Sequence, residues 1–116
     1  IITIRDKKAM NEIAKIQSEQ YWMDEAPVML AIIRENTSIE ELYGESGEKL
    51  AIQSASAFIQ NILMLCHLRG LGACWVESCD DGSIESYLGV PEGSYVDAII
   101  PIGYSLDVLE KTKNPE

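Results

Sequence analysis

The hydrophobic pattern of the chain centres on the stretch from residue 48 to residue 77. Between Leu50 and Leu68, apolar side chains occupy nearly every face of a helix. Only a narrow polar stripe at helical spacing interrupts them, formed by Gln53, Ser56, Gln60 and His67. A helix that is apolar on all sides is buried, either at the centre of a domain or against a partner subunit. The pattern therefore predicts a long, buried central helix.

Three residues mark the end of this helix. His67 and Arg69 place polar or positive groups in the last turn, where they complement the helix dipole. Gly70 then supplies the left-handed conformation with which many helices end. The run that follows, at residues 73–76, is small, apolar and aromatic, and it predicts a short strand.

An amphipathic helix is predicted upstream, from Asp6 to Trp22. Its apolar residues recur with a period of about 3.6, and Asp6 can cap its first turn. Pro27 ends this region, because proline lacks a backbone donor and restricts the residue before it to extended geometry. The continuous apolar run at residues 28–33 has the length of a typical strand and predicts a central one.

Two short helices are predicted from capping signals. A Ser-x-x-Glu capping box at Ser38 predicts a helix that ends near Gly44. Ser83 is expected to cap a second helix, which runs through Leu88 and is closed by Gly89.

The last predicted element is a strand at residues 96–103. Pro101 lies within it and suggests an edge strand or a bulge, because proline cannot donate to a sheet. The helices and about three apolar strands show no regular β-α-β alternation. This arrangement predicts an α+β fold, with one sheet covered by helices.

Composition limits the possible functions. A chain of 116 residues has room for one domain, and 47% hydrophobic with 24% charged residues is typical of a globular one. Nineteen acidic and nine basic residues give a net charge of −10, which disfavours binding to nucleic acid or to an anionic membrane surface. The longest apolar run, at residues 57–66, is too short and too polar to cross a bilayer, so we expect a soluble protein.

The two ends of the sequence suggest a fragment. The chain opens on Ile1 rather than on Met, and it stops in the turn-like run 114–116. We therefore expect a single domain over residues 1–116 that is incomplete at its N-terminus. Three cysteines without a C-x-x-C pair and without a secretory leader indicate a reducing cytoplasm.

No catalytic or metal-binding constellation is evident. The three cysteines and His67 lack the spacing of metal ligands, and we expect core thiols and a helix-end histidine. Cys79 lies in a predicted loop but has no obvious base, so nucleophilic catalysis is weakly indicated.

Gly70-Leu71-Gly72 follows a helix and precedes a strand, which is the reverse of a dinucleotide-binding loop. Trp75 with Tyr95 and Tyr104 is open to two interpretations, an aromatic ligand wall or ordinary core.

Four ordered segments resemble the FMN-dependent nitroreductase family. The first two are an alanine-rich helix with Gln60-Asn61 before a leucine-rich turn, and the run from Gly70 to Glu77 with its Gly-Leu-Gly and Trp75. The other two are Ala26-Pro27-Val28 before a strand, and Leu88-Gly89-Val90-Pro91 followed by Ile100-Pro101-Ile102-Gly103-Tyr104. Together they span residues 26–104 in the order found in that family.

The resemblance implies a fold, an assembly and a cofactor. The fold would be α+β, a mixed or antiparallel sheet flanked by helices, with the long central helix buried at a homodimer interface. FMN would lie in a cleft between subunits and carry hydride from NAD(P)H to a nitroaromatic, quinone or similar acceptor in a ping-pong reaction. A backbone N–H near Glu77 would bond the reactive flavin nitrogen, so no catalytic side chain is expected. The cofactor-binding residues implied are Gly72, Trp75, Val76, Glu77 and Ser78.

The sequence departs from the family pattern at the phosphate site. The Arg-Ser-x-Arg type of motif that holds the FMN phosphate is absent, and Lys111 or Lys113 are the candidates for the basic residues near the C-terminus. Ser78 stands where glycine is common, and Ser105 where proline is common. Two functional classes therefore remain, a flavoenzyme of the nitroreductase type and a cofactor-free dimeric module that keeps the core for binding or structure.

Overall fold

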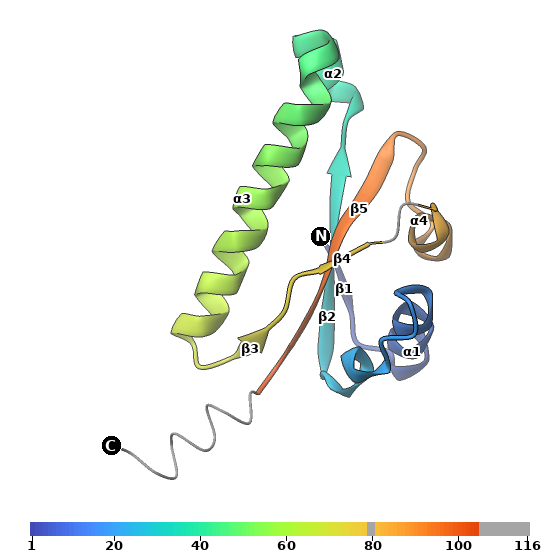
Figure 1. Ribbon diagram of the computed structural model, residues 1–116, viewed down its shortest axis with the longest axis vertical. Coiled ribbons are helices and arrows are strands. Elements are labelled where there is room, and N and C mark those ends of the chain that lie inside the picture. The colour runs from blue at the N-terminus through green and yellow to red at the C-terminus, as the bar shows by residue number, and fades with distance from the viewer. Residues whose placement is uncertain (79–80, 105–116) are drawn as a thin grey trace.

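The computed structural model describes residues 1–78 and 81–104, which form one antiparallel sheet with helices on both faces (Figure 1). The elements in chain order are β1 (Ile2–Ile4), α1 (Lys7–Ile16), η1 (Tyr21–Glu25), β2 (Val28–Glu35), α2 (Thr37–Tyr43), η2 (Gly44–Ser46), α3 (Gly47–Leu68), β3 (Gly72–Ala73), β4 (Val76–Glu77), α4 (Ser83–Leu88) and β5 (Ser94–Gly103). The predicted α+β class is confirmed.

The sheet is built around β2 and β5. Its strand order is β1-β2-β5-β3, and β4 also pairs with β5. All of these pairs are antiparallel. The apolar run at residues 28–33 therefore lies in a central strand, as predicted. The register between β2 and β5 shifts between Ile32 and Ile33, and this irregularity leaves Asp97 without a partner in the pairing.

Each face of the sheet has its own core. One core lies toward α1 and α4 and includes Met10, Ile13, Met29, Ile84 and Ile99. The other lies toward α3 and is built from Ile32, Ile59, Ala98 and Ile100. Figure 1 shows the long α3 on one side of the sheet and the shorter α1 and α4 on the other. Successive residues of β5 serve opposite faces because strand side chains alternate.

Pro101 suggested an edge strand or a bulge, and the first of these alternatives is wrong. It lies inside β5, opposite Met29 of β2, while β3 and β4 share the other side of β5. The Pro101 carbonyl accepts the N–H of Cys74 at 3.4 Å, in the gap between β3 and β4. Because Pro101 has no N–H, it cannot donate a hydrogen bond to the chain opposite it. The single strand predicted at residues 73–76 is therefore interrupted and forms the separate strands β3 and β4.

The first predicted helix is shorter than its hydrophobic period suggested. Asp6 caps α1 as expected, and its carboxylate accepts the N–H of Ala9 at 2.9 Å. The helix stops at Ile16, however, because Ser18 and Glu19 both adopt positive φ angles, of 60° and 59°. The chain turns there and continues as the separate η1.

The caps of the two short helices also differ from the predictions. The first turn of α2 is held by the carboxylate of Glu35, which accepts the N–H of Ser38. Glu35 is also the last residue of β2, a strand that was expected to stop at residue 33. Hydrogen bonds from Ser38 and then Thr37 lower the pKa of Glu35. In α4 the capping group is Asp81, whose Oδ1 accepts the N–H of Ser83 at 3.0 Å. Hydrogen bonds from the Ser83 side chain and backbone lower the Asp81 pKa.

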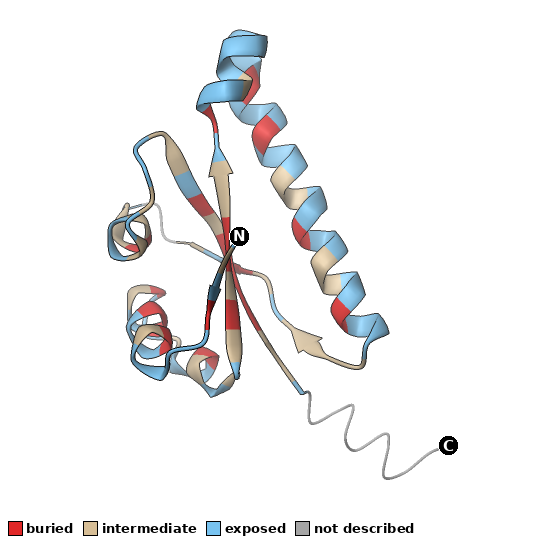
Figure 2. Ribbon diagram, turned by 180° about the vertical axis from the view of Figure 1, so that it is seen from behind, coloured by how far each residue is buried: buried red, intermediate tan, exposed pale blue. Residues whose placement is uncertain are grey.

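The central helix exists as predicted but is mostly exposed in the single chain. Only Gly47, Ala51, Ile59 and Cys66 of α3 are buried. Figure 2 shows exposed residues along most of its length. Its exposed large apolar side chains are Leu50, Ile52, Phe58, Met64, Leu65 and Leu68. Burial of this helix within the domain is therefore wrong, and burial against a partner stays a prediction.

One helical stretch, Thr37–Leu68, is long and apolar enough to cross a membrane when judged by length and composition alone. Helices that pack at the centre of a protein or against another subunit meet the same two criteria. This finding is therefore weak evidence for a membrane span.

Candidate functional site

A cavity of about 830 Å³ opens between the first half of α3 and the strands β4 and β5. Its lining residues come from α3 (Glu48, Ile52, Ser56, Ile59), from β2 and the β4 region (Arg34, Trp75, Glu77, Ser78), from α4 and its flanks (Gly82, Glu85, Ser86, Gly89, Val90, Pro91), and from the approach to β5 (Glu92, Gly93, Ser94, Tyr95, Val96, Asp97). The volume lies within the usual range for small-molecule sites.

The structure brings three of the predicted flavin-facing residues to this cavity. Trp75, Glu77 and Ser78 line it. Val76 does not, because its side chain is buried in the core on the α1 side of the sheet. Gly72 lies in β3 and is also outside the lining. The other two predicted residues, Lys111 and Lys113, lie outside the residues that the structure describes, as does Cys79.

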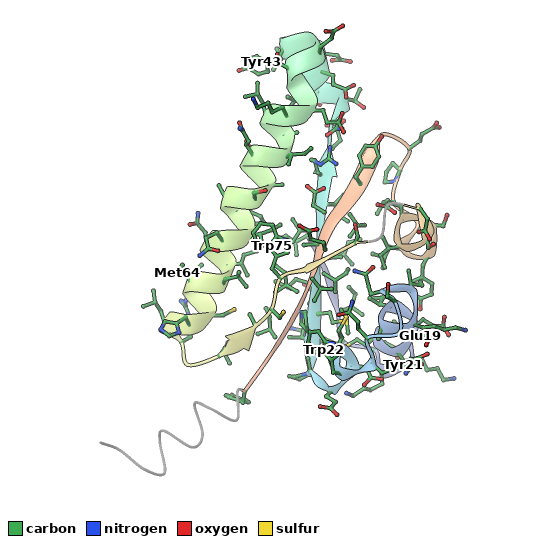
Figure 3. The ribbon with its side chains drawn as sticks, viewed as in Figure 1. Glu19, Tyr21, Trp22, Tyr43, Met64 and Trp75 are labelled. Carbon is green, nitrogen blue, oxygen red and sulfur yellow. The ribbon has the colours of Figure 1, made fainter. Side chains whose placement is uncertain are left out.

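Trp75 sits in the gap between β3 and β4 and packs between the sheet and α3 (Figure 3). Its indole Nε1 is buried and has no hydrogen-bond partner within the described residues. Ser78 directly follows β4, and its hydroxyl donates a hydrogen bond to the carbonyl of Val96. This bond holds the chain in place at the end of β4. The side chain of Trp75 and the short β4 therefore form a wall with both an aromatic surface and a peptide edge.

A half-buried ion pair that the sequence pattern did not reveal lies in the same cavity. The Nε of Arg34 donates to both carboxylate oxygens of Asp97, at 2.9 and 3.0 Å, and the side chains are only 10% and 19% exposed. A second guanidinium nitrogen of Arg34 donates to the amide oxygen of Asn36 at 2.6 Å. The guanidinium carbon lies 4.8 Å from the centre of the Tyr95 ring, within the range of a cation–π contact.

One signal in the sequence could have pointed to this pair. Asp97 interrupts an otherwise apolar strand, and acidic residues are rarely buried unless they are paired. Its partner Arg34 stands 63 residues away, beyond the strand predicted at residues 28–33, and the pairing of β2 with β5 brings the two together. Tyr95, considered with Trp75 as part of an aromatic wall, also lines the cavity, and its ring contacts the guanidinium of Arg34. Tyr104 is exposed and does not line the cavity.

The cavity is acidic. Arg34 is the one basic residue in its described lining, against the carboxylates of Glu48, Glu77, Glu85, Glu92 and Asp97. The charge of Arg34 is already paired with Asp97. One oxygen of Glu85 accepts the N–H of Val96 at 3.0 Å, while its other oxygen is buried without a partner among the described residues.

These features fit one part of FMN and not the other. The ring system needs an apolar surface and peptide groups along one edge, and Trp75, Ile59 and β4 supply both. The phosphate needs unpaired cations or a cluster of N–H donors, and the described lining has neither free Arg nor Lys. The described residues therefore fit the flavin ring, while Lys111 and Lys113 stay predictions for the phosphate.

The described part of the chain contains no group of residues suited to metal binding or to thiol catalysis. No three His, Cys, Asp or Glu side chains there are grouped so that they could hold a metal ion. Cys66 is buried in α3, as expected of a core thiol, but Cys74 is exposed, so that prediction was wrong for Cys74.

The model of the nitroreductase family matches residues 3–104, which is most of the chain and includes every strand described above except the first residue of β1. The chain belongs to the nitroreductase family. The match also covers the segment from Gly72 to Ser78 and the cavity beside it.

Individual relatives agree with this assignment. A candidate NADH dehydrogenase/NAD(P)H nitroreductase of Methanothermobacter thermautotrophicus is 29% identical over 108 residues, covering 89% of this chain and 53% of that protein. An FMN-dependent nitroreductase from Clostridium difficile has a TM-score of 0.73 at 26% identity, covering 90% of this chain and 62% of that one.

Solved structures with lower sequence identity share the fold. NfrA2 from B. megaterium has a TM-score of 0.80 at 18% identity, and the chain covers 49% of its length. The NADPH:FMN oxidoreductase from Vibrio harveyi, solved with NAD⁺, has a TM-score of 0.77 at 18% identity and is also covered over 49% of its length. The chain thus spans about half the length of these two proteins and of the curated relative.

Proposed function

We propose that the protein is an FMN-dependent oxidoreductase that uses NAD(P)H to reduce a nitroaromatic, quinone or similar small molecule. The observation that carries this proposal is that the family match includes the β4 segment, and that Trp75, Glu77 and Ser78 of this segment line the large cavity. Bound FMN would accept hydride from NAD(P)H and deliver it to the acceptor in two separate half-reactions.

The side chains of the protein would orient and enclose the ring. Trp75 offers an aromatic surface between α3 and the sheet, and the β4 backbone offers peptide groups at its edge. The ring carries the redox chemistry, so a general acid or base is not required at the described site. The acidic lining would favour neutral or cationic acceptors over anionic ones.

A homodimer is part of the proposal. The exposed apolar side chains of α3 form a surface that monomeric proteins rarely leave open to water. A second copy of α3 would cover this surface, in the way the family resemblance implies. The two unpaired cysteines in the described residues are compatible with the proposed cytoplasmic location.

An absorbance spectrum of the purified full-length protein tests the proposal directly. We expect flavin bands, release of FMN on denaturation, and NADH or NADPH oxidation that depends on an added nitroaromatic or quinone. A colourless dimer that takes up no added FMN would contradict the proposal. That result would favour the cofactor-free binding module, which the shortage of free cations in the described lining also favours.

A further inference from the structure

We propose that Gln17 positions the peptide between Glu77 and Ser78 for the flavin, and so tunes both the affinity for FMN and its redox potential. This inference rests on the proposed function, because it assigns a role to a residue that contacts the flavin-facing segment. Gln17 would act as a positioning residue, and it lies at the end of α1, a helix that does not line the cavity.

The key contact joins two segments that lie 60 residues apart. The side-chain Nε2 of Gln17 donates to the backbone carbonyl of Glu77 at 3.0 Å. Gln17 is 1% exposed, and it and Asn36 are the two buried polar residues of the described chain. A buried amide with a donor aimed at a carbonyl is costly to replace by an apolar group, because the carbonyl would lose its partner.

The backbone of Gln17 is held from both sides. Its N–H donates to the carbonyl of Ile13 at 2.9 Å, and its carbonyl accepts the side-chain amide of Gln20 at 2.8 Å. Directly after it, Ser18 and Glu19 take up left-handed conformations, and the N–H of Gln20 returns to the carbonyl of Ala14 at 3.0 Å. This tight turn at the end of α1 fixes the point from which the Gln17 side chain reaches β4.

Among the described residues, the other attachments of β4 are the pairing with β5 and the packing of Val76 in the core on the α1 side. The strand has two residues, Val76 and Glu77, and pairs with one strand, β5. The gap at residues 74–75 separates it from β3, and the Ser78 hydroxyl attaches the next residue to Val96. Gln17 therefore adds an anchor from α1, which lies on the opposite side of the sheet from α3.

This anchor acts on the N–H of Ser78 as well as on the carbonyl of Glu77. Both belong to one planar trans peptide, in which the N–H points away from the C=O. A donor to the carbonyl fixes the plane of that peptide and strengthens its N–H as a donor. An N–H beside the flavin stabilises the electron-rich reduced form more than the oxidised form.

The test compares Gln17→Met with a matched variant, Asn11→Ala, in the full-length protein. Asn11 also lies on α1, but it is exposed and donates its side-chain amide to Asp24 of η1 at 2.9 Å. Three quantities are measured: amide hydrogen exchange at Ser78 without FMN, the dissociation constant for FMN, and the midpoint potential of the bound flavin. Gln17→Glu, which keeps the shape and replaces the donor by a carboxylate, serves as a second variant.

We expect Gln17→Met to speed exchange at Ser78 and to weaken FMN binding about tenfold, the effect of one lost hydrogen bond. The potential should fall, and a tenfold change in the relative affinity for the two redox states corresponds to about 30 mV for two electrons. Gln17→Glu should shift the potential in the same direction, and Asn11→Ala should leave all three quantities unchanged.

Two results would overturn the inference in distinguishable ways. Wild-type protein that binds FMN, with a potential and Ser78 exchange that both Gln17 variants leave unchanged, would remove the role of Gln17 and leave the proposed function intact. Full-length wild-type protein that takes up no FMN would overturn both the proposed function and the role of Gln17.

Discussion

At the scale of single residues, Glu19 occupies a conformation that is costly for its side chain. Its φ angle of 59° follows the 60° of Ser18, so two consecutive non-glycine residues are left-handed. Each such residue costs about 1 kcal/mol because Cβ approaches the following carbonyl, and glycine has no Cβ. We therefore expect Glu19→Gly to raise the free energy of unfolding by roughly 1 kcal/mol, as measured by urea denaturation.

The matched control for this substitution is Glu12→Gly. Glu12 is also exposed, but it lies inside α1, where glycine lowers helix stability by about 1 kcal/mol relative to alanine. The two substitutions should therefore change stability in opposite directions. Equal destabilisation by both would mean that Glu19 does not adopt the left-handed conformation in solution.

A second prediction concerns the ion pair of Arg34 and Asp97. Removing one partner leaves a charge in a site where the Arg34 side chain is 10% exposed and the Asp97 side chain 19%. We expect Arg34→Met to cost about 2 kcal/mol, since breaking a half-buried pair leaves a partly desolvated charge without its partner. The double variant Arg34→Met/Asp97→Leu should be clearly more stable than Arg34→Met alone.

Chemical denaturation of the wild type, both single variants and the double variant gives the coupling free energy. A coupling of more than about 1 kcal/mol is expected for residues in direct contact. Additive effects of the two substitutions would show that the pair is not formed in solution, and that the side chains contribute separately.

Sequence alone predicted these residue roles unevenly. Asp6 was correctly predicted as a cap because a cap depends on neighbours three residues away. The resemblance named Trp75, Glu77 and Ser78, which line one cavity, and their contact with a cofactor stays a prediction. The Arg34–Asp97 pair was missed, because its register depends on an irregularity in the pairing of β2 with β5.

At the scale of elements, hydrophobic runs predicted the long elements and failed at the short ones. The three-residue β1 and the two-residue β3 and β4 are too short to show a period, and tertiary pairing with β2 or β5 defines them. The predicted first helix was longer than α1, because the turn at residues 18–19 contains neither glycine nor proline to mark the end of the helix. Such a turn is set by the surrounding structure, and the local sequence does not mark it.

The junction between α2 and α3 yields a prediction at this scale. Gly47 begins α3 and is buried against α2, where an added Cβ would lie 2.8 Å from Cα and 2.9 Å from N of Glu40. Both are backbone atoms, so the crowding cannot be relieved by a side-chain rotation. Gly47→Ala should therefore destabilise the protein by at least about 1 kcal/mol, although alanine is normally the better helix former.

Thermal unfolding of Gly47→Ala and of Gln53→Ala checks this prediction. Gln53 is exposed inside α3, so its replacement by alanine should be neutral or slightly stabilising. A Gly47→Ala variant as stable as Gln53→Ala would show that α2 and α3 are not packed closely at Glu40.

At the scale of the whole molecule, the many apolar residues of α3 are explained by the proposed contact with a second subunit and not by the fold of one chain alone. One side of this helix packs on Ile32, Ala98 and Ile100, while large apolar side chains stay exposed on the rest. Met64 is 51% exposed and lies on the side of α3 that faces away from the sheet (Figure 3). A second subunit would bury this surface, and apolar burial is the main driving force of permanent association.

Placing a charge on this surface tests the proposed dimer. We expect Met64→Glu to weaken dimerisation at least about 30-fold, which corresponds to roughly 2 kcal/mol, a value typical of a central interface position. Tyr87→Glu is the matched control, because Tyr87 is an exposed large side chain on α4, on the opposite face of the sheet. Sedimentation equilibrium of the FMN-loaded full-length protein gives both dissociation constants. Equal dimer affinity in the two variants would place the subunit contact away from α3 and leave its apolar surface to another partner.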